Sequence, residues 1–220
     1  MKFPCGKLLR QSFCFAKPAT IPEERRLSLS RKQMIMKMKQ EDKSKVYPLV
    51  MTAVFAALLA VFSQISIPTP TGVPITLQTF AVALCAYVLG WRLGVLAVGV
   101  YLALGAVGLP VFAGFSGGFG VFLNVTGGFL WGFLFLALLC GLGTQMEKPV
   151  VAIPLGVAGL LLCHLCGVLQ FGLLSGNPLW ESILLVSVPY LLKDTISVVL
   201  AYPAAKALRI SLKKAKLVNP

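Results

Sequence analysis

Long apolar runs, separated by short stretches rich in glycine, proline and charge, fill the sequence from residue 46 to residue 208. A helix that crosses a bilayer needs about 20 residues, because it rises about 1.5 Å per residue. The runs predict six transmembrane helices, over residues 46–67, 75–89, 93–107, 129–142, 150–174 and 182–208. The second and third are short, so we expect them to be tilted or to cross only partly.

The segment 105–128, between the third and fourth predicted helices, is apolar but contains eight glycines and no consistent helical pattern. Irregular backbone in contact with hydrocarbon would leave N–H and C=O groups without hydrogen-bond partners. We therefore expect this glycine-rich loop to be buried in protein or to line a cavity.

Composition indicates that lipid is the solvent of this chain. Hydrophobic residues make up 57% of the 220 residues and charged residues only 12%, which is too apolar for a soluble domain. The sequence predicts one membrane domain, 46–208, between tails at 1–45 and 209–220. The first tail has no apolar run long enough for a signal peptide, so we expect it to be disordered or to precede a true start in the methionine cluster 34–38.

The net charge of +13 is concentrated at the two ends of the chain. Twelve of the twenty Lys and Arg residues precede Tyr47 and five lie from Lys206 onward, which leaves Arg92, Lys148 and Lys193 in the body. Basic ends suit an anionic membrane surface, whereas nucleic-acid binding would need a basic face on a folded domain. The positive-inside rule places both termini in the cytoplasm and the glycine-rich loop outside. We predict an all-α, multi-pass protein of the cell (plasma) membrane that binds no nucleic acid.

One acid, Asp194, falls well inside a predicted span, and Lys193 stands beside it. A charge within the bilayer costs at least about 2.5 kcal/mol, so such a pair commonly serves a site or a cavity. A pair that only neutralises itself is the alternative. Tyr190, Asp194 and Ser197 follow at i, i+4 and i+7 and form a polar stripe on one helix face. Pro189 can kink this helix and open the stripe to a ligand.

Other polar side chains also occur in apolar surroundings, where most such groups form hydrogen bonds between packed helices. Gln78, Tyr101 and Asn124 lie near the outward loops, which makes them candidates for ligand contact. Helix packing is the simpler interpretation for the rest, which are Gln64, Thr126 and Gln170.

The sequence holds no catalytic constellation. His164 is the one histidine, and the segment 163–166 has two thiols on one helical face without the carboxylates or further imidazoles of a catalytic metal site. The phosphate-binding pattern G-x-x-x-x-G-K-[ST] is absent, so the chain hydrolyses no nucleotide by a P-loop. We predict a binding protein without metal or cofactor, not an enzyme, whose transport takes energy from another protein.

Small residues recur at four-residue spacing in the first predicted helix, where Ala53 and Ala57 interlock with Ala56 and Ala60. Such faces let helices approach closely in a membrane. Packing within the chain is the commoner use, and docking of a partner subunit is the alternative.

The sequence resembles BioY, the biotin-binding S component of energy-coupling factor (ECF) transporters. The matching stretches are VPITLQTFAVALCAYVLG (73–90), YLALGAVGLPVFAGFSGG (101–118) and TGGFLWGF (126–133). The resemblance covers about residues 46–208 and implies a six-helix subunit that captures biotin at the extracellular face. It also implies two ATPases and a transmembrane coupling subunit that contacts Ala53, Ala57 and Ala60.

The resemblance further implies that an acid and a lysine of the last helix matter for biotin, and these correspond to Asp194 and Lys193. The sequence departs from the family in two places. Ser197 stands where a lysine one turn after the acid is more familiar, and the usual GPTGGY reads NVTGGF over 124–129.

Biotin has a ureido ring with two N–H donors and a carbonyl, an apolar thiophane ring and a carboxylate, so its site needs an acceptor, donors, aromatic walls and a cation. Asp194 can accept from the ureido N–H groups, and Asn124 or Gln78 can pair with the ureido carbonyl. Lys193 can neutralise the carboxylate. With aromatic walls included, the predicted substrate-binding residues are Gln78, Tyr101, Phe112, Phe115, Asn124, Tyr190, Lys193, Asp194 and Ser197.

Three other interpretations stay open. The chain could be an S component for another small vitamin. An ion-coupled secondary transporter with Asp194 as its proton site is disfavoured, because inverted repeats and further intramembrane acids are absent from the sequence. A membrane scaffold without transport would leave the glycine-rich loop without a use.

Overall fold

The computed structural model describes residues 23–69, 73–146 and 148–214. The chain divides into two compact units, Met1–Ser44 and Lys45–Pro220. The second unit holds the candidate site.

In the first unit, the described residues belong to helix α1 (Glu23–Gln64). Residues 23–44 are therefore helical, which differs from the expected disorder, and the bounds of the tail stay a prediction. This stretch has neither Gly nor Pro and is rich in Lys, Arg, Gln and Met, which all favour helix. Residues 1–22 of the same predicted tail lie outside the described residues, as do 215–220 at the other end.

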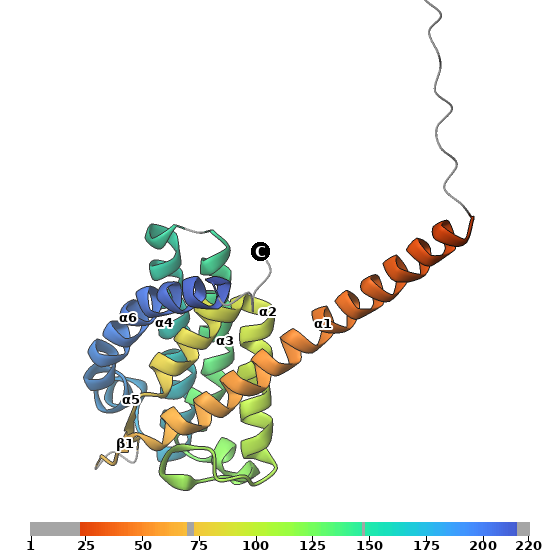
Figure 1. Ribbon diagram of the computed structural model, residues 1–220. Helices are drawn as coiled ribbons and strands as arrows, with labels where there is room; N and C mark the ends of the chain where they lie inside the picture. Colours follow the sequence, from red (N-terminus) through yellow and green to blue (C-terminus); the bar gives the residue numbers. More distant parts are fainter. Residues whose placement is uncertain (1–22, 70–72, 147, 215–220) are drawn as a thin grey trace, which may run out of the picture. The chain divides into compact units, whose positions relative to one another are not determined.

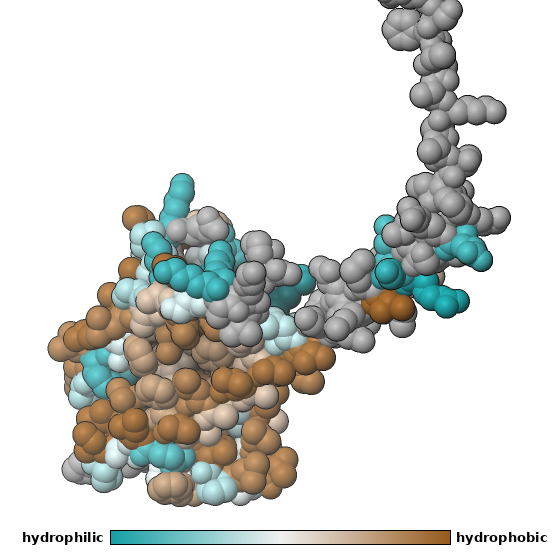
Figure 2. Space-filling model, viewed as in Figure 1, coloured by the Kyte–Doolittle hydropathy of each residue, from teal (hydrophilic) through white to brown (hydrophobic). Residues whose placement is uncertain are grey.

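The second unit is mostly helical. Its elements after α1 are β1 (Ser66–Ile67), β2 (Ile75–Thr76), α2 (Gln78–Ala106), the 3-10 helices η1 (Ala113–Phe115) and η2 (Phe119–Leu123), α3 (Gly127–Gln145), α4 (Pro149–Ser175), α5 (Leu179–Val186) and α6 (Val188–Lys214). Within the described part of the chain, five helices are long and apolar enough to cross a membrane, namely α2, α3, α4, α6 and the Val46–Gln64 part of α1. Figure 2 shows a broad apolar band on the visible face of this unit, with hydrophilic residues gathered mostly toward its two ends. The prediction of a helical membrane protein is confirmed, with a small β-hairpin in addition.

Helix α2 folds back on itself at Gly90. The φ of 79° and ψ of 177° at Gly90 are not helical, and a residue with a Cβ rarely adopts them. A straight helix would separate Gln78 from Tyr101 by about 35 Å, yet Gln78 Nε2 donates a hydrogen bond to Tyr101 Oη at 2.6 Å. A Cβ added at Gly94 would lie 2.8 Å from the Ala86 Cα, so the two arms touch along their backbones. The reversal is visible in Figure 1, where the yellow arm of α2 turns into the yellow-green arm.

Prolines set two boundaries that differ from the sequence prediction. The first membrane helix ends at Gln64 instead of residue 67, because Pro68 disfavours helix in the residue before it and Ser66–Ile67 pairs antiparallel with Ile75–Thr76. The last predicted span is broken at Ser187 into α5 and α6. Pro189 has no N–H to donate to a preceding turn, so the chain starts a new helix there.

Close contact of α3 with α2 and α4 forms the centre of this unit. A Cβ added at Gly132 of α3 would lie 2.6 Å from the Cys163 Cα of α4, which shows how small the separation of these helices is. Side chains that are fully buried there include Tyr87, Tyr101, Leu136 and Leu160.

The connections gather at the two ends of the unit. Figure 1 shows the β1–β2 hairpin, α5 and the connection from α2 to α3 at one end, and the connection from α3 to α4 at the other. The α2–α3 connection is the glycine-rich loop of the sequence and contains η1 and η2. The candidate site lies at the end that holds this loop and the hairpin.

Candidate substrate-binding site

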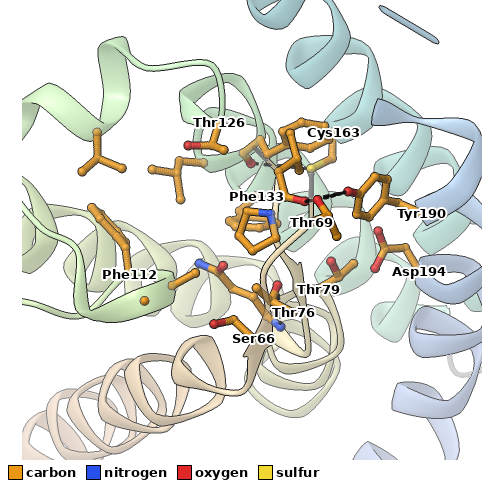
Figure 3. Close-up of a pocket in the computed structure, with 18 of the residues that line it drawn as sticks. Ser66, Thr69, Thr76, Thr79, Phe112, Thr126, Phe133, Cys163, Tyr190 and Asp194 are labelled. Atoms are coloured by element: carbon orange, nitrogen blue, oxygen red, sulfur yellow. Dashed lines mark hydrogen bonds between the residues drawn. The ribbon is translucent and has the colours of Figure 1, made fainter. Parts of the chain in front are cut away.

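A cavity of about 500 Å³, called the Asp194 cavity below, opens between the helices and these connections. Its apolar walls come from α3, α4 and the glycine-rich loop. They include Phe112, Phe129, Leu130, Phe133 and Leu160. The polar lining comes chiefly from the β-hairpin, the start of α2 and the start of α6, and Figure 3 shows Asp194 and Tyr190 reaching toward Thr69 and Thr79 across it.

An ion pair between a buried carboxylate and a half-buried lysine forms the charged part of this lining. Asp194 is 6% exposed, and its Oδ1 lies 2.6 Å from Lys193 Nζ. Lys193 Nζ also donates to the Thr76 carbonyl oxygen at 2.7 Å, which ties the start of α6 to β2. Lys193 Nζ covers Oδ1 of Asp194, which is a buried oxygen, so the ion pair is the main contact of this atom among the described residues.

His164 of α4 holds the other oxygen of this carboxylate. Its Nε2 lies 3.4 Å from Asp194 Oδ2, and its Nδ1 lies 3.2 Å from the hydroxyl of Ser187 at the break between α5 and α6. Phe129 packs edge-on against the imidazole, with ring centroids 5.7 Å apart. The imidazole therefore fixes the orientation of the carboxylate from behind, in an otherwise apolar wall.

Tyr190 fastens the β-hairpin over the cavity. Its hydroxyl donates to the Val73 carbonyl oxygen at 2.6 Å and lies 2.9 Å from Thr69 Oγ1. Thr69 Oγ1 in turn donates to the same Val73 carbonyl at 2.6 Å. Together with the bond from Lys193 to Thr76, this network holds the first part of α6, about one turn from Tyr190 to Lys193, against the hairpin.

Two glutamines hold the glycine-rich loop in place. Gln170 Nε2 donates to the carbonyl oxygens of Phe122 at 2.7 Å and Asn124 at 2.8 Å. Gln64 Oε1 accepts from the Phe115 N–H at 3.0 Å. The loop backbone is thus paired with helix side chains, as the membrane environment requires. The interpretation of Gln64 and Gln170 as packing residues agrees with these bonds.

The structure brings six of the nine predicted binding residues to the cavity, and these are Gln78, Phe112, Asn124, Tyr190, Lys193 and Asp194. The other three do not line it. Tyr101 is fully buried behind Phe112, with ring centroids 5.5 Å apart, and Ser197 donates to the Lys193 carbonyl at 2.9 Å. Phe115 is 72% exposed, because its φ of 56° turns it away from the loop interior.

Sequence reasoning missed several residues of the lining, above all His164 and the threonines Thr69, Thr76 and Thr79. His164 was weighed only as a metal ligand. Within the described residues, no three His, Cys, Asp or Glu side chains gather to hold a metal ion. A useful signal was present, because a lone histidine in an apolar helix needs a polar partner and Asp194 is the one acid deep in another span.

The alanines predicted to contact a partner are not equivalent. Ala56 is 2% exposed and packs in the core, so it cannot belong to a contact face and that prediction was wrong. Ala53 and Ala57 are exposed, and Ala60 is half-buried. Residues three apart differ by about 60° around a helix, which is enough to turn Ala56 toward the core while Ala53 and Ala57 stay exposed.

Apolar helices around a cavity with one ion pair in its lining are typical of a membrane protein that binds a small molecule. Comparison with known proteins makes the class specific. The family model described as "BioY family" matches residues 34–214, and the chain belongs to this family.

Relatives support the assignment over most of their length. A protein of Thermotoga maritima named "Biotin transporter BioY" is 41% identical over 74% of this chain and 94% of its own. A protein of Pyrococcus horikoshii named "Probable biotin transporter BioY" is 35% identical over 72% and 94%. The solved structure of an S-component for biotin from an ECF-type ABC transporter superposes with a TM-score of 0.68, at 28% identity, over 76% of this chain and 92% of its own. Because this is a transporter family, the prediction that the chain is not an enzyme is confirmed.

Proposed function

We propose that this chain is the substrate-capture (S) component of a biotin importer, which binds biotin from outside the cell and delivers it inward with an ATP-driven ECF module. The observation that carries the proposal is the Lys193–Asp194 pair in the apolar wall of a cavity of about 500 Å³, in a chain of the BioY family. The cavity falls within the range of small-molecule sites and combines aromatic walls with few polar groups.

The ureido ring of biotin lies at the Lys193–Asp194 pair in this proposal. The two charged atoms are 2.6 Å apart, so they meet the same end of a ligand. This revises the sequence-based idea that Lys193 binds the carboxylate while Asp194 binds the ureido ring. A ureido edge offers an N–H next to a carbonyl, which suits an adjacent acceptor and donor. A carboxylate at the same place would be repelled by Asp194 while Lys193 is already neutralised.

The ring then packs between Phe112, Phe129 and Phe133, and its valerate chain extends along the cavity away from the ion pair. Asn124 serves as a second partner of the ureido carbonyl or of the carboxylate. Gln78 acts through its bond with Tyr101, which leaves its carbonyl oxygen for the cavity.

We further propose that the two arms of α2 cross the membrane separately, so that the chain has six crossings and the glycine-rich loop faces outward. The arms, 78–89 and 91–106, are about 18 and 24 Å long, shorter than the hydrocarbon core of about 30 Å. They agree with the short second and third spans of the sequence. Trp91 and Arg92 at the turn, with the guanidinium 5.0 Å from the indole centroid, suit a membrane interface. Both termini then lie in the cytoplasm, at the plasma membrane, with 209–220 and the segment before residue 46 as basic tails.

The energy for transport comes from a coupling subunit and two ATPases in this proposal. The exposed Ala53 and Ala57, with Ala60 at the edge of the same face, form the surface on which the coupling subunit docks. Small side chains there permit close helix contact.

Retention of tritiated biotin by the purified full chain in detergent tests the proposal. We expect retention at micromolar biotin that unlabelled biotin displaces, and loss of most of it in Asp194→Asn. Biotin methyl ester, which lacks the negative charge, should compete within about threefold of biotin. An analogue methylated at a ureido nitrogen should compete at least about tenfold less well, since it removes one hydrogen bond to a charged group.

Two results would contradict the proposal. No retention at micromolar biotin, or displacement by a different vitamin but not by biotin, would overturn the substrate. If the methyl ester competes much less well than the ureido analogue, biotin remains the substrate, but its carboxylate and not its ureido ring lies at the Lys193–Asp194 pair.

A further inference from the structure

The lining of the Asp194 cavity changes in character from one side to the other. Figure 3 shows Asp194 and Tyr190 of α6 on one side and Phe112 of the glycine-rich loop on the opposite side. Asp194 is 6% exposed, whereas the loop residues Gly114 and Asn124, which also line the cavity, are exposed. The cavity therefore has a buried side at α6, called the α6 side, and an exposed side at the loop, called the loop side.

Among the described residues, every charged side chain that lines the cavity belongs to the α6 side. These side chains are Lys193 and Asp194, which pair with each other at 2.6 Å. The loop side offers neutral groups instead, namely the hydroxyls of Ser116 and Thr126 and the carboxamide of Asn124. Neither the loop sequence 105–128 nor the hairpin sequence 66–76 contains a charged residue. The loop side therefore offers a ligand hydrogen bonds but no cation.

This distribution of charge affects the carboxyl end of a bound biotin. With biotin as the substrate and its ureido ring at the Lys193–Asp194 pair, both of which rest on the function proposed above, the carboxyl end lies at the loop side. A carboxylate there meets no cation, and a charge in a cavity is costly unless it is paired or reaches water. An amide carries no charge, and hydroxyl and carboxamide groups can pair with its N–H and C=O. The loop side therefore requires no carboxylate.

Asn124 is placed to recognise the group that an acid and an amide share. Its Oδ1 accepts from the Val125 N–H at 2.8 Å, which fixes the side chain on the loop. Its backbone carbonyl accepts from Gln170 Nε2 at 2.8 Å, which ties this part of the loop to α4. Asn124 Nδ2 makes no hydrogen bond within the described part of the chain, so it can donate to a carbonyl oxygen in the cavity. Such a donor serves an acid and an amide alike.

The loop side also leaves room for a substituent on the carboxyl carbon. A Cβ added at Gly114 would meet nothing within 4 Å, so the space beside this residue is open. A group joined to the ligand there can leave the cavity past Gly114 without displacing a helix.

From this arrangement we infer that the chain binds amides of biotin with small amines, such as biotin amide and Nε-biotinyl-lysine, as well as free biotin. The ureido ring lies at the Lys193–Asp194 pair in each ligand. The amide carbonyl accepts from Asn124 Nδ2, and the amine substituent extends past Gly114. The negative charge of biotin is dispensable for binding, which widens the substrate class from one acid to biotin joined to small amines.

Competition against tritiated biotin on the purified full chain tests this inference. We expect biotin amide and biotinyl-lysine to compete within about threefold of unlabelled biotin, because the hydrogen bond from Asn124 is kept. The control ligand is Nε-acetyl-lysine, which has the same amide without the biotin rings and should not compete. Tritiated biotinyl-lysine should also be retained directly, and Asp194→Asn should remove most of that retention.

The variant Asn124→Asp locates the carboxyl end. It keeps the size of the side chain and the acceptor for the Val125 N–H, but it adds a negative charge at the loop side. Biotin should lose about threefold to tenfold more affinity than biotin amide, because only the acid is repelled. Asn177→Asp makes the same change in the connection between α4 and α5, outside the cavity lining, and should change the ratio of the two affinities less than about twofold.

The outcomes separate this inference from the proposed function. If biotin binds but both amides compete more than about thirtyfold less well, the inference is overturned and the proposed function stands. If neither biotin nor the amides are retained, both are overturned. Equal losses of biotin and biotin amide in Asn124→Asp would show that the carboxyl end does not lie at the loop side, which also overturns the inference.

Discussion

Two cavities of this protein differ in the charged side chains that line them. In the Asp194 cavity, a carboxylate, an ammonium and an imidazole contact one another in an apolar wall. A second cavity, of about 670 Å³ and called the Lys206 cavity, lies at the turn of α2 and the end of α6, where Lys206, Arg209 and Lys213 line it. A charge balanced in advance costs less to keep in a low dielectric and leaves directed hydrogen bonds for a neutral group. The first cavity therefore has opposite charges in contact, whereas the second is lined by cations from one helix face.

Asp194→Asn removes the carboxylate charge from the Asp194 cavity and has the largest expected effect. It keeps the shape but removes the negative charge beside the half-buried Lys193 and weakens acceptance from the ureido ring. We expect biotin affinity to fall roughly tenfold to a hundredfold, the range for a hydrogen bond to a charged group, as measured by equilibrium binding of tritiated biotin.

The matched control is Glu181→Gln, because Glu181 is an exposed acid of α5 that does not line the cavity. Its affinity should stay within twofold. Equal losses in the two variants would mean that total charge, not the local pair, governs binding.

Gly132→Ala tests whether the wall that holds Cys163 and His164 depends on close contact between α3 and α4. The new Cβ would lie 2.6 Å from the Cys163 Cα, so the helices must separate. We expect a loss of about 1–3 kcal/mol in the free energy of unfolding, measured by denaturant titration in detergent.

Gly99→Ala serves as the comparison, since nothing lies within 4 Å of its added Cβ. It should leave stability unchanged or raise it by about 0.5–1 kcal/mol, because alanine favours helix. Similar destabilisation by both changes would refute the argument from helix separation.

His164→Ala tests the imidazole, one of three groups that contact one another in the Asp194 cavity, with Asp194 and Lys193. The carboxylate of Asp194 then loses its contact at 3.4 Å and gains freedom to rotate. A decrease of about three- to tenfold in biotin affinity is expected, which corresponds to one hydrogen bond. Ser187→Ala, which removes only the bond to the other imidazole nitrogen, should have a smaller effect in the same assay, and the reverse order would argue against this role.

Lys206→Gln has the smallest expected effect on biotin. The Lys206 side chain lies in the other cavity, far along α6 from Asp194, and exposed charges at such a distance are screened. Binding of biotin in 0.15 M salt should change less than twofold. A larger change would mean that the charge in the Lys206 cavity is coupled to biotin binding in the Asp194 cavity.

The sequence anticipated the polar stripe of α6 well. Hydropathy and spacing placed Asp194 in a span, and the structure puts Asp194, Lys193 and Tyr190 on one cavity. Ser197 shows the limit of spacing, because a hydroxyl can satisfy its own helix backbone, as it does with the Lys193 carbonyl. Tyr101 was predicted to contact the ligand, but it lies in the layer behind the cavity lining, packed against Phe112.

The threonines of the β-hairpin and His164 could not be derived in the same way. The place of the threonines depends on contacts across more than 100 residues, such as Tyr190 with Val73 and Lys193 with Thr76. The place of His164 depends on the packing of α4 against α6. No local pattern encodes such distances, since each partner alone reads as an ordinary loop or helix residue.

What the sequence alone determined was the solvent of this chain, the position of its apolar helices and the residue types that a polar site inside lipid requires. These follow from local transfer energies that each segment carries by itself. Only the tertiary structure decided which polar groups meet. The reversal at Gly90 brings Gln78 to Tyr101, and the packing of α4 against α6 brings His164 to Asp194. Pairing of buried polar groups is a property of two segments at once, so it appears only when the helices are assembled.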